Sequence, residues 1–263
     1  TRVLLIASGK GGVGKSSVTT NLAVALAQRG KKVAVVDADV WGFSIPRMLG
    51  VEHPPAVIDS MLVPPTGAGG VRCISMGFFA KEDQPVIWRG PMASSFLKQL
   101  ISQGDWGELD YLIFDLPPGT SDIHLTLVQE VPVTGAIVVT TPQEVALADA
   151  RKGIAMFRSE AINVPVLGLV ENMSYFETPE LPGRRYYIFG REGGSRLATE
   201  SGTLLLGQIP IVESICDGGD SGRPAALEDN ATGTAFRNLA DMVVKQVEIR
   251  NAELAPTKRV EMK

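Results

Sequence analysis

The sequence predicts an α/β fold, a mostly parallel doubly wound sheet with helices on both faces. Short apolar runs rich in β-branched residues recur along the chain, and segments with apolar residues at helical spacing separate them. No internal repeat or low-complexity segment interrupts this alternation, which is typical of strands joined by crossover helices. With 263 residues, 44% of them hydrophobic, the chain can bury one sizeable core. We therefore expect a single domain over residues 1–250 and a mobile tail over 251–263.

The elements follow one another in a regular order. The first expected strand covers residues 3–7, an unbroken apolar run, and the first expected helix covers 17–29, where Val18, Leu22 and Leu26 share one face. Further strands are expected at 32–36, 71–76, 111–115, 136–141, 166–171 and 204–210. Further helices are expected at 91–103, 122–130, with Asp122 as its cap, 144–160 and 234–249. Residues 51–72 predict turns and short edge strands, and residues 217–224 predict a turn-rich loop.

A glycine-rich segment joins the first strand to the first helix. It reads Ser8-Gly9-Lys10-Gly11-Gly12-Val13-Gly14-Lys15-Ser16, the phosphate-loop spacing of Gly, four residues and Gly-Lys-Ser. Glycines let successive N–H groups point into one concavity, and a helix N-terminus favours anions. Lys15 can reach the β- and γ-phosphates and Ser16 can hold Mg²⁺, although a flexible turn is the alternative. The predicted nucleotide contacts are Gly9, Lys10, Gly11, Gly12, Val13, Gly14, Lys15, Ser16 and Ser17.

Carboxylates stand at the ends of two later strands. Asp37 and Asp39 follow the second strand, and Asp115 ends the strand at 111–115. Because parallel sheets bind ligands at the carboxyl ends of their strands, these groups can hold Mg²⁺ through water or orient a nucleophilic water. Asp115 can share a metal-bound water with Ser16, and Gly119 can turn its N–H toward a γ-phosphate. The alternatives are that Asp37 caps the next segment and that Asp115 is a solvated strand end. The predicted domain is thus a P-loop nucleotide-binding domain, and the resemblance described below implies that it is a P-loop ATPase domain.

Composition excludes several classes of function. The formal net charge of −4 argues against nucleic acid as a partner, because such binding needs a basic surface. No apolar run reaches the roughly 18 residues of a membrane span, and no signal peptide is recognisable, so we expect no membrane partner. Cys73 and Cys216 make no disulfide framework, which favours the reducing cytoplasm. The chain starts at Thr1 without an initiator Met, so we expect it to be processed or truncated and a preceding domain to be missing.

Several strings carry a family resemblance. Lys10 inside Lys-Gly-Gly-Val-Gly-Lys-Ser resembles the deviant Walker A class, which includes MinD, ParA, the nitrogenase iron protein and the Mrp/ApbC carriers. Within that class the chain resembles the Mrp/ApbC family of iron–sulfur cluster carriers over nearly its whole length. The strings are Asp37-Ala38-Asp39-Val40-Trp41-Gly42-Phe43-Ser44-Ile45-Pro46, Trp88-Arg89-Gly90-Pro91-Met92 and Asp115-Leu116-Pro117-Pro118-Gly119. Trp41 replaces the usual Tyr, and Phe43 stands where Pro is frequent.

The resemblance implies an ATP-hydrolysing homodimer that needs Mg²⁺. It assigns the catalytic roles to Lys10, which would reach the partner's nucleotide, to Lys15, and to Asp39, which would place the attacking water, and it puts Asp37 near the metal. The alternative for Lys10 is a solvated loop lysine. The resemblance also implies that Asn172 bonds the adenine, with turn formation as its alternative. The base would be flanked by Pro210, Val212 and Glu213, of which Glu213 either accepts from the adenine or faces water.

The cargo implied by the resemblance is an iron–sulfur cluster, passed to apo iron–sulfur proteins or received from cluster assembly factors. Many family members bind a [4Fe–4S] cluster through Cys-x-x-Cys, but Thr178 and Leu181 occupy those positions here. One account is that Cys216 or Cys73 of each subunit supplies other ligands, although we expect Cys73 to be a small buried apolar residue. A second account requires an absent domain or partner. The third is a MinD/ParA-like nucleotide-switched binding protein that has lost cluster binding.

Overall fold

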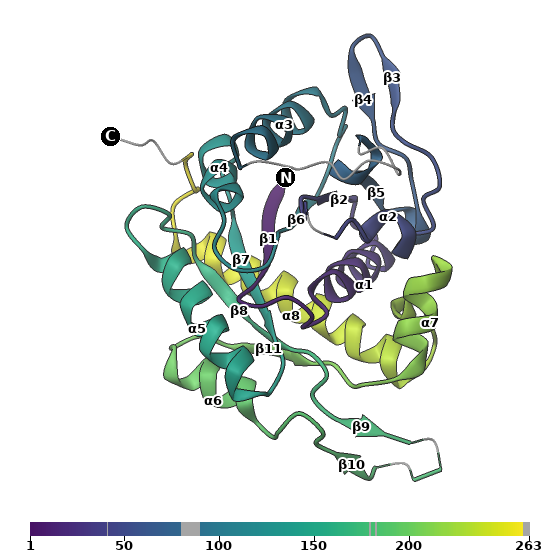
Figure 1. Ribbon diagram of the computed structural model, residues 1–263, viewed down its shortest axis with the longest axis vertical. Coiled ribbons are helices and arrows are strands. Elements are labelled where there is room, and N and C mark those ends of the chain that lie inside the picture. Colours follow the sequence, from purple (N-terminus) through teal and green to yellow (C-terminus); the bar gives the residue numbers. More distant parts are fainter. Residues whose placement is uncertain (41, 80–89, 179, 182, 260–263) are drawn as a thin grey trace.

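A computed structural model of the chain describes residues 1–40, 42–79, 90–178, 180–181 and 183–259 (Figure 1). Trp41, Trp88 and Arg89 of the family strings therefore lie outside the described residues. No helix within these ranges is long and apolar enough to cross a membrane.

The central sheet confirms the predicted architecture. Within the described residues it has seven strands in the order β11-β8-β7-β1-β6-β2-β5, and every neighbouring pair is parallel. The first strand therefore lies in the middle of the sheet, flanked by β6 and β7. The strands are β1 (Arg2–Ser8), β2 (Val33–Asp37), β5 (Arg72–Ser75), β6 (Tyr111–Asp115), β7 (Gly135–Thr140), β8 (Val166–Glu171) and β11 (Leu205–Gln208).

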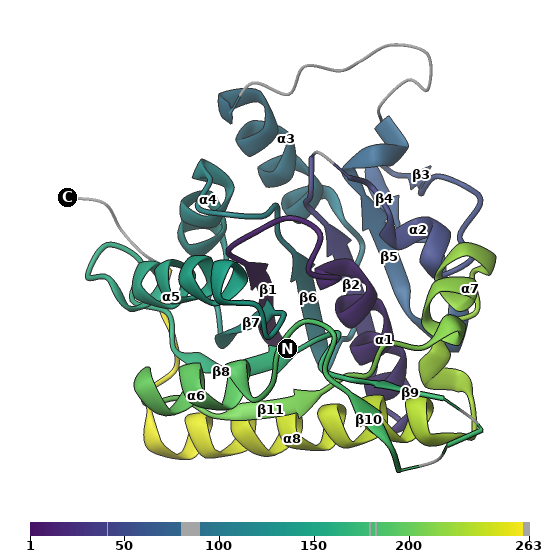
Figure 2. The same cartoon turned by 60° about the horizontal axis from the view of Figure 1, so that its bottom comes forward.

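Helices cover both faces of this sheet (Figures 1 and 2). One face packs against α1 and α8, and the other against α3, α4, α5 and α6. Figure 2 shows the long α8 lying along β8 and β11. The helices are α1 (Lys15–Gln28), α2 (Ile45–Met48), α3 (Gly90–Gln103), α4 (Asp122–Glu130), α5 (Glu144–Arg158), α6 (Gly193–Glu200), α7 (Glu213–Ser221) and α8 (Ala231–Glu253). Short 3₁₀ turns lie at Ala68–Gly70, Met76–Phe79 and Ala225–Leu227.

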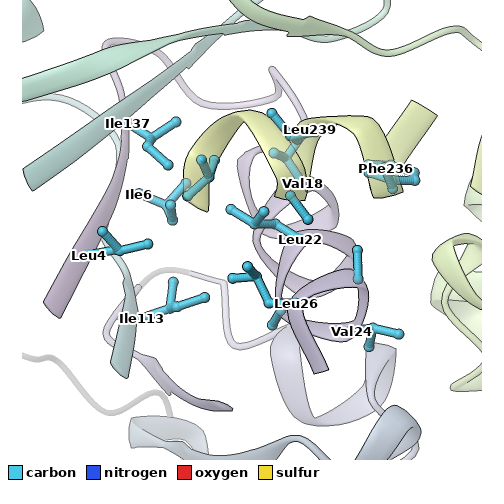
Figure 3. Packing of buried hydrophobic residues seen from close by; sticks show 14 of the residues in the cluster. Leu4, Ile6, Val18, Leu22, Val24, Leu26, Ile113, Ile137, Phe236 and Leu239 are labelled. Carbon is cyan, nitrogen blue, oxygen red and sulfur yellow. The ribbon is translucent and has the colours of Figure 1, made fainter. Parts of the chain in front are cut away.

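The alternation of side chains along each strand fills two cores. In β1, Leu4 and Ile6 face α1 and α8, whereas Val3 and Leu5 face the opposite layer. Figure 3 shows Leu22 of α1 close to the strand residues on the first side. Because both faces are covered, the strands consist of continuous apolar runs, as the sequence indicated.

Two small hairpins project from the sheet. They are β3 (Ala56–Ile58) with β4 (Met61–Val63), and β9 (Phe176–Glu177) with β10 (Arg185–Tyr186). The first lies in the segment where we expected turns and short edge strands. The second contains the positions where the resemblance led us to expect cysteines (Figure 1).

Two local expectations are wrong. The segment 217–224 is not a loop at its start, because α7 continues to Ser221 and ends at Gly222 with φ of 71°. Gly218 is tolerated inside that helix since it packs against the Arg223 carbonyl, where a Cβ would lie 2.5 Å away. Asp122 does not cap α4; Ser121 is the N-cap, and Asp122 is the first helical residue.

The end of the chain also differs from the predicted boundary. Helix α8 runs past residue 250 to Glu253, and Asn230 caps its start by accepting from the Gly233 N–H at 2.9 Å. The Arg250 guanidinium donates to the Ala255 carbonyl at 3.0 Å and to the Thr257 hydroxyl at 2.5 Å. Part of the expected tail therefore continues the last helix, and the residues after it bond back to that helix.

Candidate functional site

The phosphate loop lies between the central strand β1 and the N-terminus of α1. Gly12 and Gly14 have φ of 81° and 79°, values that favour glycine. Gly14 is also the N-cap of α1, and a Cβ there would lie 2.2 Å from the Asn172 amide nitrogen. A Cβ on Gly9 would lie 2.2 Å from the Asp149 carbonyl carbon. The loop thus keeps its shape only with glycine at these positions.

Lys15 and Asp115 form the buried centre of the site. The Lys15 ammonium lies 2.8 Å from Asp115 Oδ2, and both side chains are buried. The Ser16 hydroxyl donates to the same oxygen at 2.6 Å. The other Asp115 oxygen accepts from the Thr19 hydroxyl at 2.6 Å. Sequence reasoning did not identify Thr19, although its place one helical turn after Lys15 put it on the same face of α1.

The second strand brings two more carboxyl groups to this point. Asp39 Oδ2 lies 3.5 Å from the Lys15 ammonium. Asp37 is fully buried and pairs with Asp115 across β2 and β6. Burial, and then the charge of Asp115, raise the pKa of Asp37 to about 8. Its carboxyl group accepts from the Ser75 hydroxyl at 3.0 Å and from the Ile45 N–H at 3.3 Å.

The loop encloses a cavity of about 240 Å³, lined by residues 10–17 with Ser8, Asp39, Ser44, Met48 and Pro118. The described residues contain no group of three or more His, Cys, Asp or Glu side chains that could hold a metal. They do offer the Ser16 hydroxyl beside the Asp115 carboxylate. This donor set fits Mg²⁺ that arrives with phosphate and keeps its waters, rather than a cation in an all-protein cage.

Lys10 differs from Lys15 in its surroundings. It lies on the rim of the same cavity and is exposed. Within the part of the chain that the structure describes, its ammonium makes no hydrogen bond or ion pair. A second cation is therefore available at the mouth of the site.

The residues expected at the base lie next to the phosphate loop. Asn172 follows β8, is buried, and donates from its side-chain amide to the Val13 carbonyl at 2.9 Å. Pro210 is buried, whereas Val212 is the N-cap of α7 and Glu213 begins that helix as an exposed residue. The structure places Asn172 against the loop, and a contact of any of these residues with adenine stays a prediction.

The two cysteines lie in contrasting environments. Cys73 on β5 is fully buried, as expected, and burial raises the pKa of its thiol. Cys216 is exposed on α7. Thr178 and Leu181 lie in the connection between β9 and β10, where the Leu181 N–H donates to the Thr178 carbonyl at 3.1 Å. The described hairpin residues offer no thiol.

The chain matches the ParA family model described as NUBPL iron-transfer P-loop NTPase over residues 1–245. It is 45% identical over 251 residues to the iron–sulfur cluster carrier protein of Synechocystis, covering 93% of this chain and 70% of that protein. It is 47% identical over 248 residues to the Escherichia coli protein of the same name, covering 93% and 66%. An Arabidopsis thaliana iron–sulfur protein required for NADH dehydrogenase, mitochondrial, is 44% identical over 264 residues, with 99% and 83% covered.

Solved structures show the same fold. The nucleotide-binding protein from Archaeoglobus fulgidus, in complex with ADP, superposes with a TM-score of 0.76 at 35% identity, covering 99% of this chain and 94% of that chain. The cell division ATPase MinD from Pyrococcus furiosus superposes with a TM-score of 0.71 at 27% identity, covering 93% and 98%.

Proposed function

Because the chain belongs to the ParA family of NUBPL-type iron-transfer P-loop NTPases, we propose that it is an ATP-hydrolysing dimeric carrier or scaffold for iron–sulfur clusters. The proposed partners are apo iron–sulfur proteins or cluster assembly factors. The proposed compartment is the reducing cytoplasm, since both cysteines are free thiols.

The buried contact between Lys15 and Asp115 is the observation that carries the ATPase proposal. Asp115 holds the Lys15 ammonium at 2.8 Å and the Ser16 hydroxyl at 2.6 Å at one point of the phosphate loop. A cation, a hydroxyl and a carboxylate at the N-terminus of α1 suit the phosphates of ATP and their Mg²⁺. Asp39, 3.5 Å from the same ammonium, is the proposed residue that places the attacking water.

The dimer proposal rests on Lys10. Its exposed ammonium lies at the rim of the cavity, where it can meet the phosphates of a second copy. A cation supplied in this way would stabilise charge that develops on the γ-phosphate during hydrolysis. ATP would thus close two copies over their phosphate loops, and hydrolysis would release them.

Two lysine variants test the ATPase proposal. We expect Lys15→Ala to abolish nucleotide binding, because it removes the ammonium that faces the phosphates. We expect Lys10→Ala to bind nucleotide like the wild type but to lose turnover and nucleotide-dependent dimerisation. Calorimetry, phosphate release and sedimentation measure these three properties. Unchanged turnover in Lys10→Ala would refute its role across the dimer.

The carrier proposal requires cluster ligands other than those of the hairpin. Cys216 is the exposed thiol in the described part of the chain, whereas Cys73 is buried in the core. Anaerobic cluster reconstitution with iron quantification and an absorbance spectrum tests this point on the wild type, on Cys216→Ala and on Cys73→Ala as the matched control. We expect loss of iron only in Cys216→Ala. A wild type without iron would contradict direct cluster binding.

The second candidate function is a nucleotide-switched binding protein of the MinD/ParA kind that has lost cluster binding. Thr178 and Leu181 at the hairpin favour it, since neither side chain ligates iron. This candidate predicts nucleotide-dependent dimerisation together with no bound iron in the reconstituted wild type. The same two experiments therefore separate the two functions.

A further inference from the structure

A buried carboxyl group outside the phosphate site connects three segments. Glu171 ends β8, and its side chain is fully buried with no cation bonded to it among the described residues. One of its oxygens accepts from the Ser174 hydroxyl at 2.5 Å and from the Gln208 amide at 2.9 Å. The other accepts from the Gly194 N–H at 2.5 Å. A buried acid with three donors of this kind is held in one orientation.

The bond to Ser174 closes the turn that carries Asn172. Met173 in that turn has φ of 53°, an uncommon value for a residue with a side chain. Such a conformation persists only where its surroundings impose it. The Glu171–Ser174 bond spans the strained residue, and it thereby helps to set the direction of the neighbouring Asn172 amide.

The bond to Gln208 ties the same turn to the segment that leads to α7. Backbone bonds run in parallel with it: the Ile209 N–H donates to the Glu171 carbonyl at 2.9 Å, and the Ser174 N–H donates to the Ile209 carbonyl at 2.9 Å. Pro210, Val212 and Glu213 follow directly. The two segments proposed to flank the base are therefore joined through one side chain.

The third bond places the start of α6 on this carboxyl group. Gly194 lies so close that a Cβ at its position would be 2.9 Å from Glu171 Oε2. The carboxyl group thus has no room to move toward α6. Its three hydrogen bonds fix the two proposed base-flanking segments relative to each other.

We propose that Glu171 is a positioning residue for the nucleotide base. The proposal rests on the proposed function, because it assumes that Asn172 and residues 210–213 contact the base. In this proposal Glu171 acts without contacting the nucleotide itself. It holds the two flanking segments at a fixed separation. It therefore controls how much the base contributes to the affinity for the nucleotide, beyond the contribution of the phosphates.

Two variants test the proposal with two probes, ADP and inorganic triphosphate, which lacks a base. Glu171→Gln replaces one carboxyl oxygen by an NH₂ group, so only one of the two terminal atoms of the side chain can still accept hydrogen bonds. Ser174→Ala removes only the bond that closes the turn. Thr134→Val is the matched control, because its hydroxyl accepts from the Val3 N–H at 3.0 Å at the opposite end of β1. Calorimetry measures both affinities, and thermal unfolding confirms that each variant folds.

We expect both variants to bind ADP about five- to tenfold more weakly, the loss of about one hydrogen bond to the base, and to bind inorganic triphosphate like the wild type. Thr134→Val should change neither affinity. Equal weakening of both probes would overturn the proposal and leave a merely structural role. Unchanged ADP binding, or a wild type that binds ADP no more tightly than inorganic triphosphate, would overturn it too. A wild type that binds neither probe would instead contradict the proposed function.

Discussion

Lowering the pH from 8 to 5 is expected to destabilise the chain through His124, and His124→Gln should remove that part of the pH dependence. His124 lies in the first turn of α4 and is 1% exposed. Its Nδ1 accepts from the Ser121 N–H at 3.2 Å and completes the capping box of the helix, whereas its buried Nε2 has no partner among the described residues. Protonation at Nδ1 would abolish this cap.

The magnitude follows from the pKa of the imidazole. Burial lowers the pKa of His124 from 6.5 to about 4, against the smaller opposing effect of the Ser121 carbonyl, which lies 3.1 Å from Nδ1 and accepts from a protonated ring. The unfolded chain therefore binds a proton between pH 6.5 and about 4 while the folded chain does not. The contribution of the neutral His124 to the free energy of unfolding is fully present above pH 6.5 and is lost as the pH falls toward the folded pKa of about 4. The loss is about 2 kcal/mol at pH 5 and approaches about 3 kcal/mol below pH 4.

Urea unfolding followed by circular dichroism at pH 8 and pH 5 measures the effect. His124→Gln is the informative variant, because Gln at this position still reaches the N-cap backbone but does not titrate. Other groups titrate in both proteins and cancel in the difference. We expect the wild type to lose about 2 kcal/mol more than His124→Gln between the two pH values. A difference below about 0.5 kcal/mol, which is within the error of such extrapolations, would refute the reasoning.

Three further predictions concern other parts of the chain. Gly14→Ala should abolish ADP binding in calorimetry and lower the unfolding free energy by about 1–3 kcal/mol, because φ is 79° and the new Cβ would meet the Asn172 amide; wild-type affinity would contradict this. Leu22→Ala should cost about 2–5 kcal/mol in urea unfolding, as it opens a cavity between α1 and the sheet. An aromatic disulfide reagent should react with one thiol of the native protein, exposed Cys216, and with two after denaturation, when Cys73 is released; two reactive native thiols would argue against the buried Cys73.

The sequence was sufficient for features that depend on neighbouring residues. The alternation of buried runs and helical spacing predicted a parallel sheet with helices on both faces, because crossover connections leave few other arrangements. The spacing from Gly9 to Ser16 predicted a phosphate loop, and two of its glycines, Gly12 and Gly14, have the positive φ that favours glycine. Helix α7 was missed, because its glycines and aspartates are typical of turns and only packing makes the helix tolerable.

The strand-end pattern predicted Asp39 at the site and the resemblance predicted Asn172 there, but their contacts required the tertiary structure. Asn172 donates to the Val13 carbonyl, a partner 159 positions away in the chain.

What the sequence by itself determined is the fold class and the phosphate loop, because both follow from interactions within one element or between consecutive ones. Only the tertiary structure decided that Asp115 holds Lys15 and Thr19 from 100 and 96 positions away, and that Glu171 joins Ser174 to Gln208. Such contacts depend on which strands become neighbours and on which side chains lose water together. The spacing of residues along the chain does not predict which strands become neighbours or which side chains are buried together.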